Sequence, residues 1–337
     1  MITQGDYTFR LATAEDQNDI IRFMDENWEG KHPLIHIPEF FEFYYRNAVG
    51  LNFALAQDKE GALQAICGFV PANVHYSSIW ISLWLSKKGT TGAGLELMSL
   101  MDDLTKATVI CCNNIRPNTI PFYDMLGFTA TRLPHFYRLA NKPLAEFKIA
   151  RLKEVLIKDV FGDAPLTLIT DPYQIESNFT VPKDHVPFKD NWYIQRRYFM
   201  YPMQDKMQYR VYGSYENGAI KALVVLREVD VEGTKVLRLV DYIGDFAFFA
   251  QLGKALDALL QESGAEYMDM YVYGLEDNIL EAAGFIERVE GDINIIPNYL
   301  TPPLYENTEY YFFTNTTKNF TMFKADGDQD RPNMIIE

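Results

Sequence analysis

A run from an apolar strand into a short helix that ends in Gly-Phe occurs in Thr108-Val-Ile-Cys-Cys-Asn-Asn-Ile-Arg-Pro-Asn-Thr-Ile-Pro-Phe-Tyr-Asp-Met-Leu-Gly-Phe128. The same pattern returns, about half the chain further on, in Glu266-Tyr-Met-Asp-Met-Tyr-Val-Tyr-Gly-Leu-Glu-Asp-Asn-Ile-Leu-Glu-Ala-Ala-Gly-Phe285. A segment that recurs in this way indicates that one structural unit is present twice. The repeat therefore predicts two copies of one fold and, with them, two domains.

The length and composition suit two packed interiors. The chain has 337 residues, of which 48% are hydrophobic. That length fits two domains of roughly 150 residues, each with its own core. No stretch reaches the ~20 consecutive apolar residues of a membrane span, and the first residues lack the basic and apolar regions of a signal peptide. We therefore expect a soluble, cytoplasmic protein.

The charge of the chain argues against some partners. Acidic residues outnumber basic ones by 46 to 31, which gives a formal net charge of −15. A surface of that sign repels phosphate backbones, so we expect no nucleic-acid partner.

We predict no metal site. Cys67, Cys111 and Cys112 lie within apolar runs, and the adjacent pair would point to opposite faces of a strand, which suits buried thiols. Three aspartates alternate near the end of the chain as in a calcium loop, but the full pattern of such a loop is not met. We interpret this stretch as a polar tail that is solvated or folds back near the domain cleft.

Apolar periodicity and turn signals predict the order of the elements. In the first half we expect a strand at 7–12, a helix at 13–24 that is capped by Thr13, and an aromatic helix at 38–47. A three-strand meander follows at 52–56, 65–71 and 78–85. A Gly-rich loop at 86–94 then opens a helix at 95–104, and the repeat at 108–128 ends this half. The second half repeats the order with strands at 208–214, 219–229 and 236–243, a helix at 246–263 and the repeat at 266–285. Between the halves, residues 147–160 are predicted to be helical.

This order of elements resembles the GNAT acyltransferase fold, from about Tyr7 to Leu139 and again from about Gln208 to Phe285. The resemblance implies an α/β (α+β) protein with two tandem GNAT-like domains, each a mixed, mostly antiparallel sheet flanked by helices. We expect an N-terminal domain at 1–145, a partly helical connection at 146–200, a degenerate C-terminal domain at 201–310 and a polar tail at 311–337.

Several longer phrases are similar to bacterial GNAT-like proteins of surface-polysaccharide biosynthesis. They are Trp28-Glu-Gly-Lys-His32, Arg197-Tyr198, Val240-Asp241-Tyr-Ile-Gly244, Ile296-Pro-Asn-Tyr299 and Asp326-Gly-Asp-Gln-Asp-Arg-Pro-Asn333. The resemblance implies a small-molecule amine acceptor, such as a nucleotide-linked amino sugar.

The Gly-rich loop at 87–94 follows a strand and opens a helix, so its backbone N–H groups could cradle a pyrophosphate. GNAT proteins bind coenzyme A there, usually through Arg or Gln, two residues, Gly, one residue, and Gly or Ala. Here Gly92-Ala-Gly94 supplies the glycines and Gly89 stands in place of the Arg or Gln; a flexible loop before a capped helix is the alternative. The resemblance implies an acyl-CoA, acetyl-CoA first, as co-substrate. The implied contacts are Leu83, Leu85, Lys88, Gly89, Thr90, Thr91, Gly92, Ala93, Gly94, Leu95 and Asn118.

Tyr123 stands where many GNAT enzymes carry a tyrosine that faces the cofactor sulfur. Its phenol could protonate the departing thiolate as a general acid; the alternative is an aromatic ring packed between helix and sheet. The same position in the second repeat is Leu280, which has no proton to donate, and the loop after Gly244 offers one glycine beside an acidic residue. The sequence therefore predicts that only the first half is catalytic.

Acylation of an amine also needs a base. His32 lies between the first two helices, and a histidine titrates near neutrality, so His32 is the predicted base. Glu26, Glu29, His75 and Tyr76 are the alternatives. We assign Trp28, His75, Arg197 and Asp241 to the acceptor site. An arginine there could hold a diphosphate or a sugar carboxylate, and interface salt bridges are the alternative.

The sequence thus favours an acyl-CoA-dependent N-acyltransferase, N-acetylating, that acts on a small amine. One rival is a FemX-like transferase that takes aminoacyl groups from tRNA, although the acidic charge and the lack of a basic coiled-coil arm speak against it. The other is a non-catalytic binding or scaffold protein with two decayed GNAT domains, which the departure at Gly89 supports.

Overall fold

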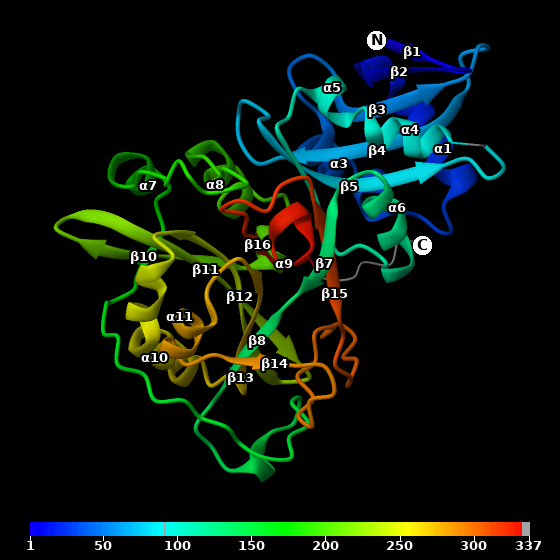
Figure 1. Ribbon diagram of the computed structural model, residues 1–337. Helices are drawn as coiled ribbons and strands as arrows, with labels where there is room; N and C mark the ends of the chain where they lie inside the picture. Colours follow the sequence, from blue (N-terminus) through cyan, green and yellow to red (C-terminus); the bar gives the residue numbers. More distant parts are fainter. Residues whose placement is uncertain (91, 332–337) are drawn as a thin grey trace. The chain divides into compact units, whose positions relative to one another are not determined.

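The computed structural model describes residues 1–90 and 92–331, and the chain divides into two compact units (Figure 1). Unit 1 contains Met1–Thr131 and Tyr311–Lys318. Unit 2 contains Arg132–Tyr310 and the segment that begins at Asn319. Within the described residues, each unit is therefore built from two separate stretches of the chain, and the boundary predicted at residue 145 lies inside unit 2.

Unit 1 holds a mixed sheet in the order β1-β2-β3-β4-β5-β6-β15-β7. Neighbours run antiparallel from β1 to β5 and between β6 and β15, whereas β5 and β6 run parallel. The strands are β1 (Ile2–Gln4), β2 (Tyr7–Ala12), β3 (Leu51–Gln57), β4 (Leu63–Pro71), β5 (Ser78–Ser86), β6 (Val109–Asn113), β7 (Thr129–Leu133) and β15 (Tyr310–Thr314). The helices are α1 (Gln17–Asn27), α2 (Pro33–His36), α3 (Pro38–Tyr45), α4 (Ala93–Ser99), α5 (Met101–Thr105) and α6 (Ile120–Met125), with 3₁₀ turns at Ala14–Asp16 and Pro117–Thr119.

Local signals account for the first helix of unit 1. The carboxylate of Asp16 accepts a hydrogen bond from the backbone N–H of Thr13 at 2.7 Å, within the 3₁₀ turn that leads into α1. Ile20, Phe23 and Met24 recur at helical spacing and are buried. Helix α1 thus begins directly after the 3₁₀ turn at Ala14–Asp16, and its apolar face is buried in unit 1.

Unit 2 holds a second mixed sheet in the order β14-β8-β13-β12-β11-β10-β9, and β16 pairs with β13 beside this path. All the described neighbours are antiparallel except β12 and β13, which run parallel. The strands are β8 (His135–Leu139), β9 (Thr167–Ile169), β10 (Tyr209–Glu216), β11 (Ala219–Val231), β12 (Thr234–Gly244), β13 (Tyr267–Tyr273), β14 (Ile286–Arg288) and β16 (Met322–Phe323). The helices are α7 (Tyr173–Asn178), α8 (Asn191–Tyr198), α9 (Gln204–Met207), α10 (Gly253–Ser263) and α11 (Asp277–Ala282), with 3₁₀ turns at Leu144–Glu146, Ala247–Leu252 and Asp326–Asp328.

The two sheets are completed by an exchange of strands. β8 follows the first Gly-Phe helix and β7 along the chain, yet it pairs with β13 and β14 of unit 2. β15 follows the second Gly-Phe helix and β14, yet it pairs with β6 of unit 1. In unit 1, β15 thus lies between β6 and β7, and in unit 2, β8 lies between β13 and β14. Each of these inserted strands comes from the other half of the chain. The exchange satisfies backbone hydrogen bonds that a buried strand edge would otherwise lack.

The segment predicted as a helix at 147–160 has no helix, and this prediction is wrong. The buried carboxylate of Glu266 accepts hydrogen bonds from the backbone N–H groups of Lys148, Ile149 and Ala150. Those donors are turned toward one side chain, so they are not available for a helical ladder. The predicted helix at 95–104 is also broken into α4 and α5 at Leu100.

The polar segment near the chain end is buried, so the expectation of a solvated tail is wrong. Tyr310–Thr314 forms β15, and Phe320 to Asp330 lie mostly within unit 2. Asp326, Asp328 and Asp330 are each 4% exposed or less. Buried carboxylates persist only with cationic or hydrogen-bonding partners, and these partners are described below.

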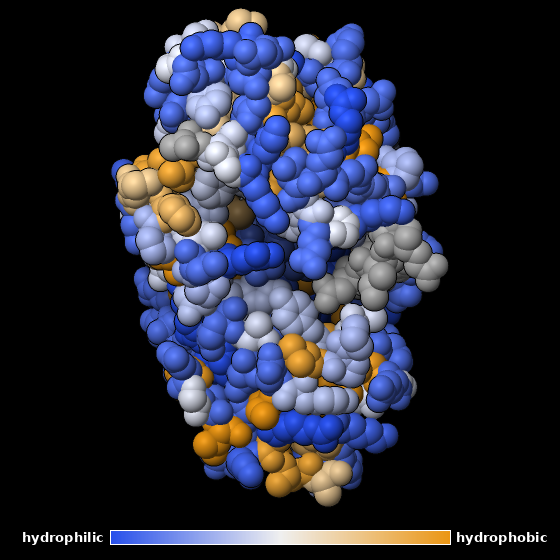
Figure 2. Space-filling model, turned by 90° about the vertical axis from the view of Figure 1, so that its right-hand side faces the viewer, coloured by the Kyte–Doolittle hydropathy of each residue, from blue (hydrophilic) through white to orange (hydrophobic). Residues whose placement is uncertain are grey.

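Much of the surface seen in Figure 2 is hydrophilic, with hydrophobic side chains in several separate groups. This pattern is ordinary for a folded chain rich in charged residues. Within the described residues, no helix has the length and apolar character needed to cross a membrane.

A buried histidine joins three strands of unit 2. His135 of β8 is fully buried, and its Nε2 lies 3.1 Å from a carboxylate oxygen of Asp269 on β13. The Nε of Arg288 on β14 donates to His135 Nδ1 at 3.1 Å. Because Nδ1 accepts this bond, it carries no proton, and the ring is a neutral imidazole that donates through Nε2. Burial, opposed by Asp269, lowers the pKa of His135 from its usual 6.5 to about 4.

We expect His135 to make the protein less stable as the pH falls from 6.5 toward 4. In that window the unfolded chain binds a proton at this residue and the folded chain does not, so the free energy of unfolding declines with falling pH, by about 3 kcal/mol in total. His135→Gln keeps an N–H donor and a carbonyl acceptor but does not titrate. Urea unfolding of both proteins across this range should show a shallower acid decline in the variant.

The comparison between the two proteins isolates His135. Asp326, whose pKa burial raises to about 6, titrates in the same window with the opposite effect on stability, but it does so in both proteins. Parallel pH profiles in the variant and the wild type would show that His135 does not titrate as described.

Candidate functional site

In unit 1 the parallel strands β5 and β6 separate soon after they begin. Their ladder covers Ser78 to Trp80, whereas β5 continues beside β4 as far as Ser86. From Ile81 onward, the edge of β5 that faced β6 has no strand neighbour among the described residues. The backbone amides on such an edge can bind an extended ligand that carries amides of its own. We call the place where these two strands separate the fork of unit 1.

A bulge marks the start of the open edge. Opposite β4, the register of β5 passes from Leu83 to Ile81 across one residue, so Ser82 is the extra residue. The hydroxyl of Ser82 lies 3.0 Å from the hydroxyl of Tyr45, which is buried at the end of α3. A bulged residue is left out of the ladder, so Ser82 has no paired residue on β4.

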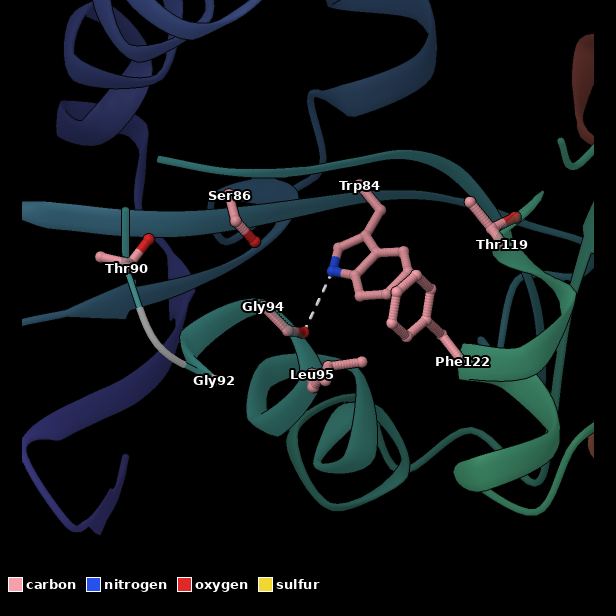
Figure 3. A pocket seen from close by; sticks show the side chains of 8 residues that line it. All are labelled: Trp84, Ser86, Thr90, Gly92, Gly94, Leu95, Thr119 and Phe122. Atoms are coloured by element: carbon pink, nitrogen blue, oxygen red, sulfur yellow. Dashed lines mark hydrogen bonds between the residues drawn. The ribbon is translucent and has the colours of Figure 1, made fainter. Parts of the chain in front are cut away.

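A pocket of about 310 Å³ lies at the far end of the open edge (Figure 3). Its walls come from the end of β5, the Gly-rich loop, the start of α4, and the 3₁₀ turn and helix α6 of the repeat. The lining residues are Trp84, Ser86, Thr90, Gly92, Gly94, Leu95, Thr119 and Phe122. The Gly-rich loop and the first Gly-Phe helix, far apart in the sequence, thus contribute to one cavity.

Trp84 connects the strand to the loop. Its indole Nε1 donates to the backbone carbonyl of Gly94 at 3.0 Å, and Figure 3 shows the indole directed from β5 toward the first turn of α4. Phe122 of α6 is 46% exposed at the pocket wall. The pocket therefore offers two aromatic faces to an apolar or planar part of a ligand.

Two glycines of the loop are required by the backbone. Gly92 has φ 83°, a left-handed conformation that residues with a side chain rarely adopt. At Gly94 a Cβ would lie 2.0 Å from Ser86 Oγ and 3.4 Å from Trp84 Nε1. The absence of a side chain at Gly94 thus lets the start of α4 lie close to the end of β5.

Tyr123 is only 5% exposed and packs beneath the pocket. Its ring centre lies 5.8 Å from that of Trp84 and 4.1 Å from that of Phe313 on β15, with which it stacks. Burial raises the pKa of the Tyr123 hydroxyl well above its usual value, and a hydrogen bond with Thr119 opposes the rise. The phenol therefore keeps its proton at neutral pH. It touches two wall residues of the pocket but does not line it.

Of the predicted cofactor contacts, Thr90, Gly92, Gly94 and Leu95 line the pocket. The other predicted contacts in the described chain are not lining residues: Leu83 and Ala93 are buried, Leu85 is partly exposed, and Lys88, Gly89 and Asn118 are exposed. Thr91 lies outside the described residues.

Sequence reasoning missed Trp84, Ser86, Thr119 and Phe122. Trp84 and Ser86 lie on one face of β5, whereas the residues chosen, Leu83 and Leu85, lie on the other, because side chains alternate along a strand. The alternation was visible in the sequence, but the bulge at Ser82 was not, so the sequence did not show which face of β5 lines the pocket. For Phe122, the signal was an aromatic residue in the repeat directly before Tyr123.

The residues assigned to the acceptor side lie apart from this pocket. His32 caps α2, and its ring packs edge-on against that of Trp28, with centres 5.4 Å apart. Neither lines the pocket. His75 is exposed in the connection before β5, whereas the pocket lies at the end of that strand, roughly 25 Å away at 3.3 Å per residue.

Arg197 and Asp241 belong to unit 2, where both are buried in ion pairs. Arg197 of α8 is 3% exposed and contacts Asp328 and Asp330 at 3.2 and 2.5 Å. Asp241 of β12 is fully buried and accepts from Lys189 at 2.7 Å and from the hydroxyl of Tyr198 at 2.5 Å. Their charges are thus matched by partners within unit 2. The described residues contain no cluster of three or more side chains suited to a metal ion.

No family model matches the sequence, and no curated protein matches it. Among solved structures, the chain is similar to a GCN5-related N-acetyltransferase from Anabaena variabilis, with TM-score 0.52 and 10% identity over 91% of this chain and 72% of that one.

Two further solved structures have lower scores. A GCN5-related N-acetyltransferase from Sphaerobacter thermophilus has TM-score 0.39 and 10% identity over 99% of both chains. The N-myristoyltransferase of Saccharomyces cerevisiae with bound myristoyl-CoA has TM-score 0.42 and 12% identity over 99% of this chain and 84% of that one. Of the three, the first exceeds 0.5, and at 10% identity it shows a shared fold and nothing finer. The predicted fold class is confirmed.

Proposed function

We propose that this chain is an acyl-CoA-dependent N-acyltransferase, N-acetylating, that acts on a small amine. The single observation that carries the proposal is the open edge of β5, which leads from the bulge at Ser82 into the pocket beside Gly92 and Gly94. An acyl-CoA has the matching parts in the matching order: a thioester, an arm with two amides, and a diphosphate. The similarity in fold to N-acetyltransferases supports the same reading.

Each part of unit 1 has a role in this proposal. The backbone amides of β5 beyond Ile81 bind the amide-bearing arm, and the bulge at Ser82 polarises the thioester carbonyl. The loop from Gly92 to Leu95 accepts the diphosphate because its glycines allow a close approach to the backbone. The exposed Lys87 and Lys88 supply positive charge beside the loop in place of the missing arginine.

The proposed chemistry is transfer of the acyl group from sulfur to nitrogen. His32 takes a proton from the acceptor ammonium, the amine attacks the thioester carbon, and a C–N bond forms as the C–S bond breaks. Tyr123 donates its proton to the departing thiolate, and the proton that the nitrogen loses as the amide forms passes through solvent to the tyrosine phenolate. From the resemblance in the sequence, we propose an amino sugar or a related precursor of surface polysaccharide as the acceptor.

We expect Gly94→Val to weaken acetyl-CoA binding at least about tenfold, because the added Cβ would lie 2.0 Å from Ser86 Oγ and would push the start of α4 and the side chain of Ser86 out of their places in the pocket wall. Calorimetric titration of the wild type and the variant measures the change. Ser99→Val is a matched control, because it adds the same side chain at the exposed far end of α4.

Three results are decisive. Weaker binding in Gly94→Val, with Ser99→Val unchanged, supports the assigned site. Equal affinity in wild type and Gly94→Val places the cofactor elsewhere. No heat of binding from the wild type with acetyl-CoA or CoA at millimolar concentration removes the proposed mechanism altogether.

A further inference from the structure

Unit 2 contains its own fork, at the place that corresponds to the fork of unit 1. Its parallel strands β12 and β13 pair at Leu237 with Met268 and at Arg238 with Asp269, and then separate. β12 continues to Gly244 and β13 to Tyr273. As in unit 1, the second of the two strands leads into the Gly-Phe helix of its repeat. The two units thus share a geometry, but they differ in what lies between the strands.

The fork of unit 2 is occupied by the protein's own chain. β16 pairs antiparallel with β13, with Phe323 opposite Val272 and Met322 opposite Tyr273. On the other side, the N–H of Ala325 donates to the carbonyl of Val240 on β12 at 3.0 Å. The segment therefore bonds through its backbone to both arms of the fork, as an extended peptide ligand does.

The next residues of this segment carry three carboxylates into a buried cationic region. Asp326 lies 2.7 Å from Lys189 Nζ. Asp330 lies 2.5 Å from the guanidinium of Arg197, and its backbone carbonyl accepts from Arg227. Asp328 shares Arg197 at 3.2 Å. Lys189, Arg197, Arg227 and the three aspartates are all at least nine-tenths buried.

Hydroxyl groups complete the recognition of these carboxylates. Tyr209 donates to Asp330 at 2.7 Å, and Tyr201 donates to Asp328 at 3.2 Å. Burial alone would lower the pKa of Lys189, but Asp241 and Asp326 raise it, so the lysine is charged. Charge-assisted contacts of this kind discriminate strongly against a ligand that lacks the carboxylate.

The segment enters the fork from an exposed stretch. Residues 317–319 are exposed, whereas Phe320 to Asp328 and Asp330 are buried. The division between the units also falls here, because unit 1 ends at Lys318 and unit 2 resumes at Asn319. The chain can therefore be cut at this stretch without a change in the buried contacts.

We propose that the fork of unit 2 is a peptide-binding groove whose resident ligand is the segment 319–331 of this chain. The groove binds an extended acidic peptide. The peptide backbone lies between β12 and β13, and Lys189, Arg197 and Arg227 bind the aspartates at alternate positions. The segment acts as a ligand tethered to the protein, and its tether through 315–318 is not needed for binding.

The test begins with the intact folded protein. A protease recognition sequence is inserted between Thr317 and Lys318, and the purified chain is cut there. We expect the released segment to stay bound and to elute with the rest of the protein during gel filtration at micromolar concentration. A labelled synthetic peptide of residues 319–331 should then exchange into the cut protein but should not bind the uncut one, whose groove is filled.

Two peptides test whether the groove recognises the carboxylates and the order of the residues. A peptide with Asp326, Asp328 and Asp330 changed to asparagine should bind the cut protein at least about 100-fold more weakly, because buried charges would lose their partners. A peptide of the same composition in scrambled order should not exchange.

Several results would overturn the proposal. Release of the segment on cutting, with no uptake of the synthetic peptide, is one. Unfolding on cutting that the peptide does not reverse is another, because it would make the segment an integral part of the core. Equal binding of the aspartate and asparagine peptides would remove the proposed recognition by charge.

Discussion

Replacing Arg197 with methionine should lower the free energy of unfolding by about 3–5 kcal/mol, the usual cost of removing one partner from a buried ion pair. Arg197 is 3% exposed and faces the carboxylates of Asp328 and Asp330. Methionine keeps an unbranched apolar stem but supplies no charge, so two carboxylates would be left with less compensation. Urea denaturation at neutral pH, followed by circular dichroism, measures the change.

The neighbouring residue provides a matched control. Arg196 lies on the same helix, is partly exposed, and its guanidinium packs 5.3 Å from the ring centre of Trp192. Arg196→Met should change the free energy of unfolding by only about 0.5 kcal/mol, as surface substitutions usually do. A similar, small loss in both variants would show that the buried ion pairs contribute little to the stability of unit 2.

Replacing Tyr123 with phenylalanine should lower kcat about 1,000-fold, within the range that general acids contribute. The ring and its packing against Trp84 and Phe313 are kept, and only the hydroxyl is lost. Acetyl-CoA affinity should therefore change little. Thiol release from acetyl-CoA, with an amino-sugar nucleotide as the acceptor, measures the rate.

The pH profile adds a second readout for Tyr123. Because burial raises the pKa of its hydroxyl, the proton is retained through the working range, and the wild type should show no alkaline decline from this group. Tyr311→Phe is the matched control, since Tyr311 packs against the same core cluster. Full activity in Tyr123→Phe would identify Tyr123 as a packing residue alone.

Local patterns were good predictors of single elements. The Asn217-Gly218 turn joins β10 to β11 as predicted, and both residues have positive φ, which a tight hairpin between such strands requires. Thr13 also stands at an N-cap as predicted, although it caps the 3₁₀ turn Ala14–Asp16 and α1 begins after that turn. Failure came where a distant side chain intervened, as at 147–160, where Glu266 takes the backbone donors of an expected helix.

The candidate site was predicted in part. The Gly-rich loop lines the pocket, and the positive φ of Gly92 is a local requirement that the sequence shows, whereas Gly94 is required by its contact with Ser86 and Trp84 of β5. Trp84 and Phe122 were missed because they meet only after β5 and α6 are brought together. The acceptor residues stay proposals, and Arg197 and Asp241 have buried partners in unit 2.

The sequence alone determined the two Gly-Phe repeats, the glycine loop ahead of the first of them, and the strands and helices that lead up to each repeat, because each depends on residues close together in the chain. Only the tertiary structure decided which strand completes each sheet and what lies in each fork. Backbone edges and buried charges must find partners wherever the chain can supply them. In unit 2 those partners are the aspartates near the chain end, which the sequence alone had presented as a polar tail.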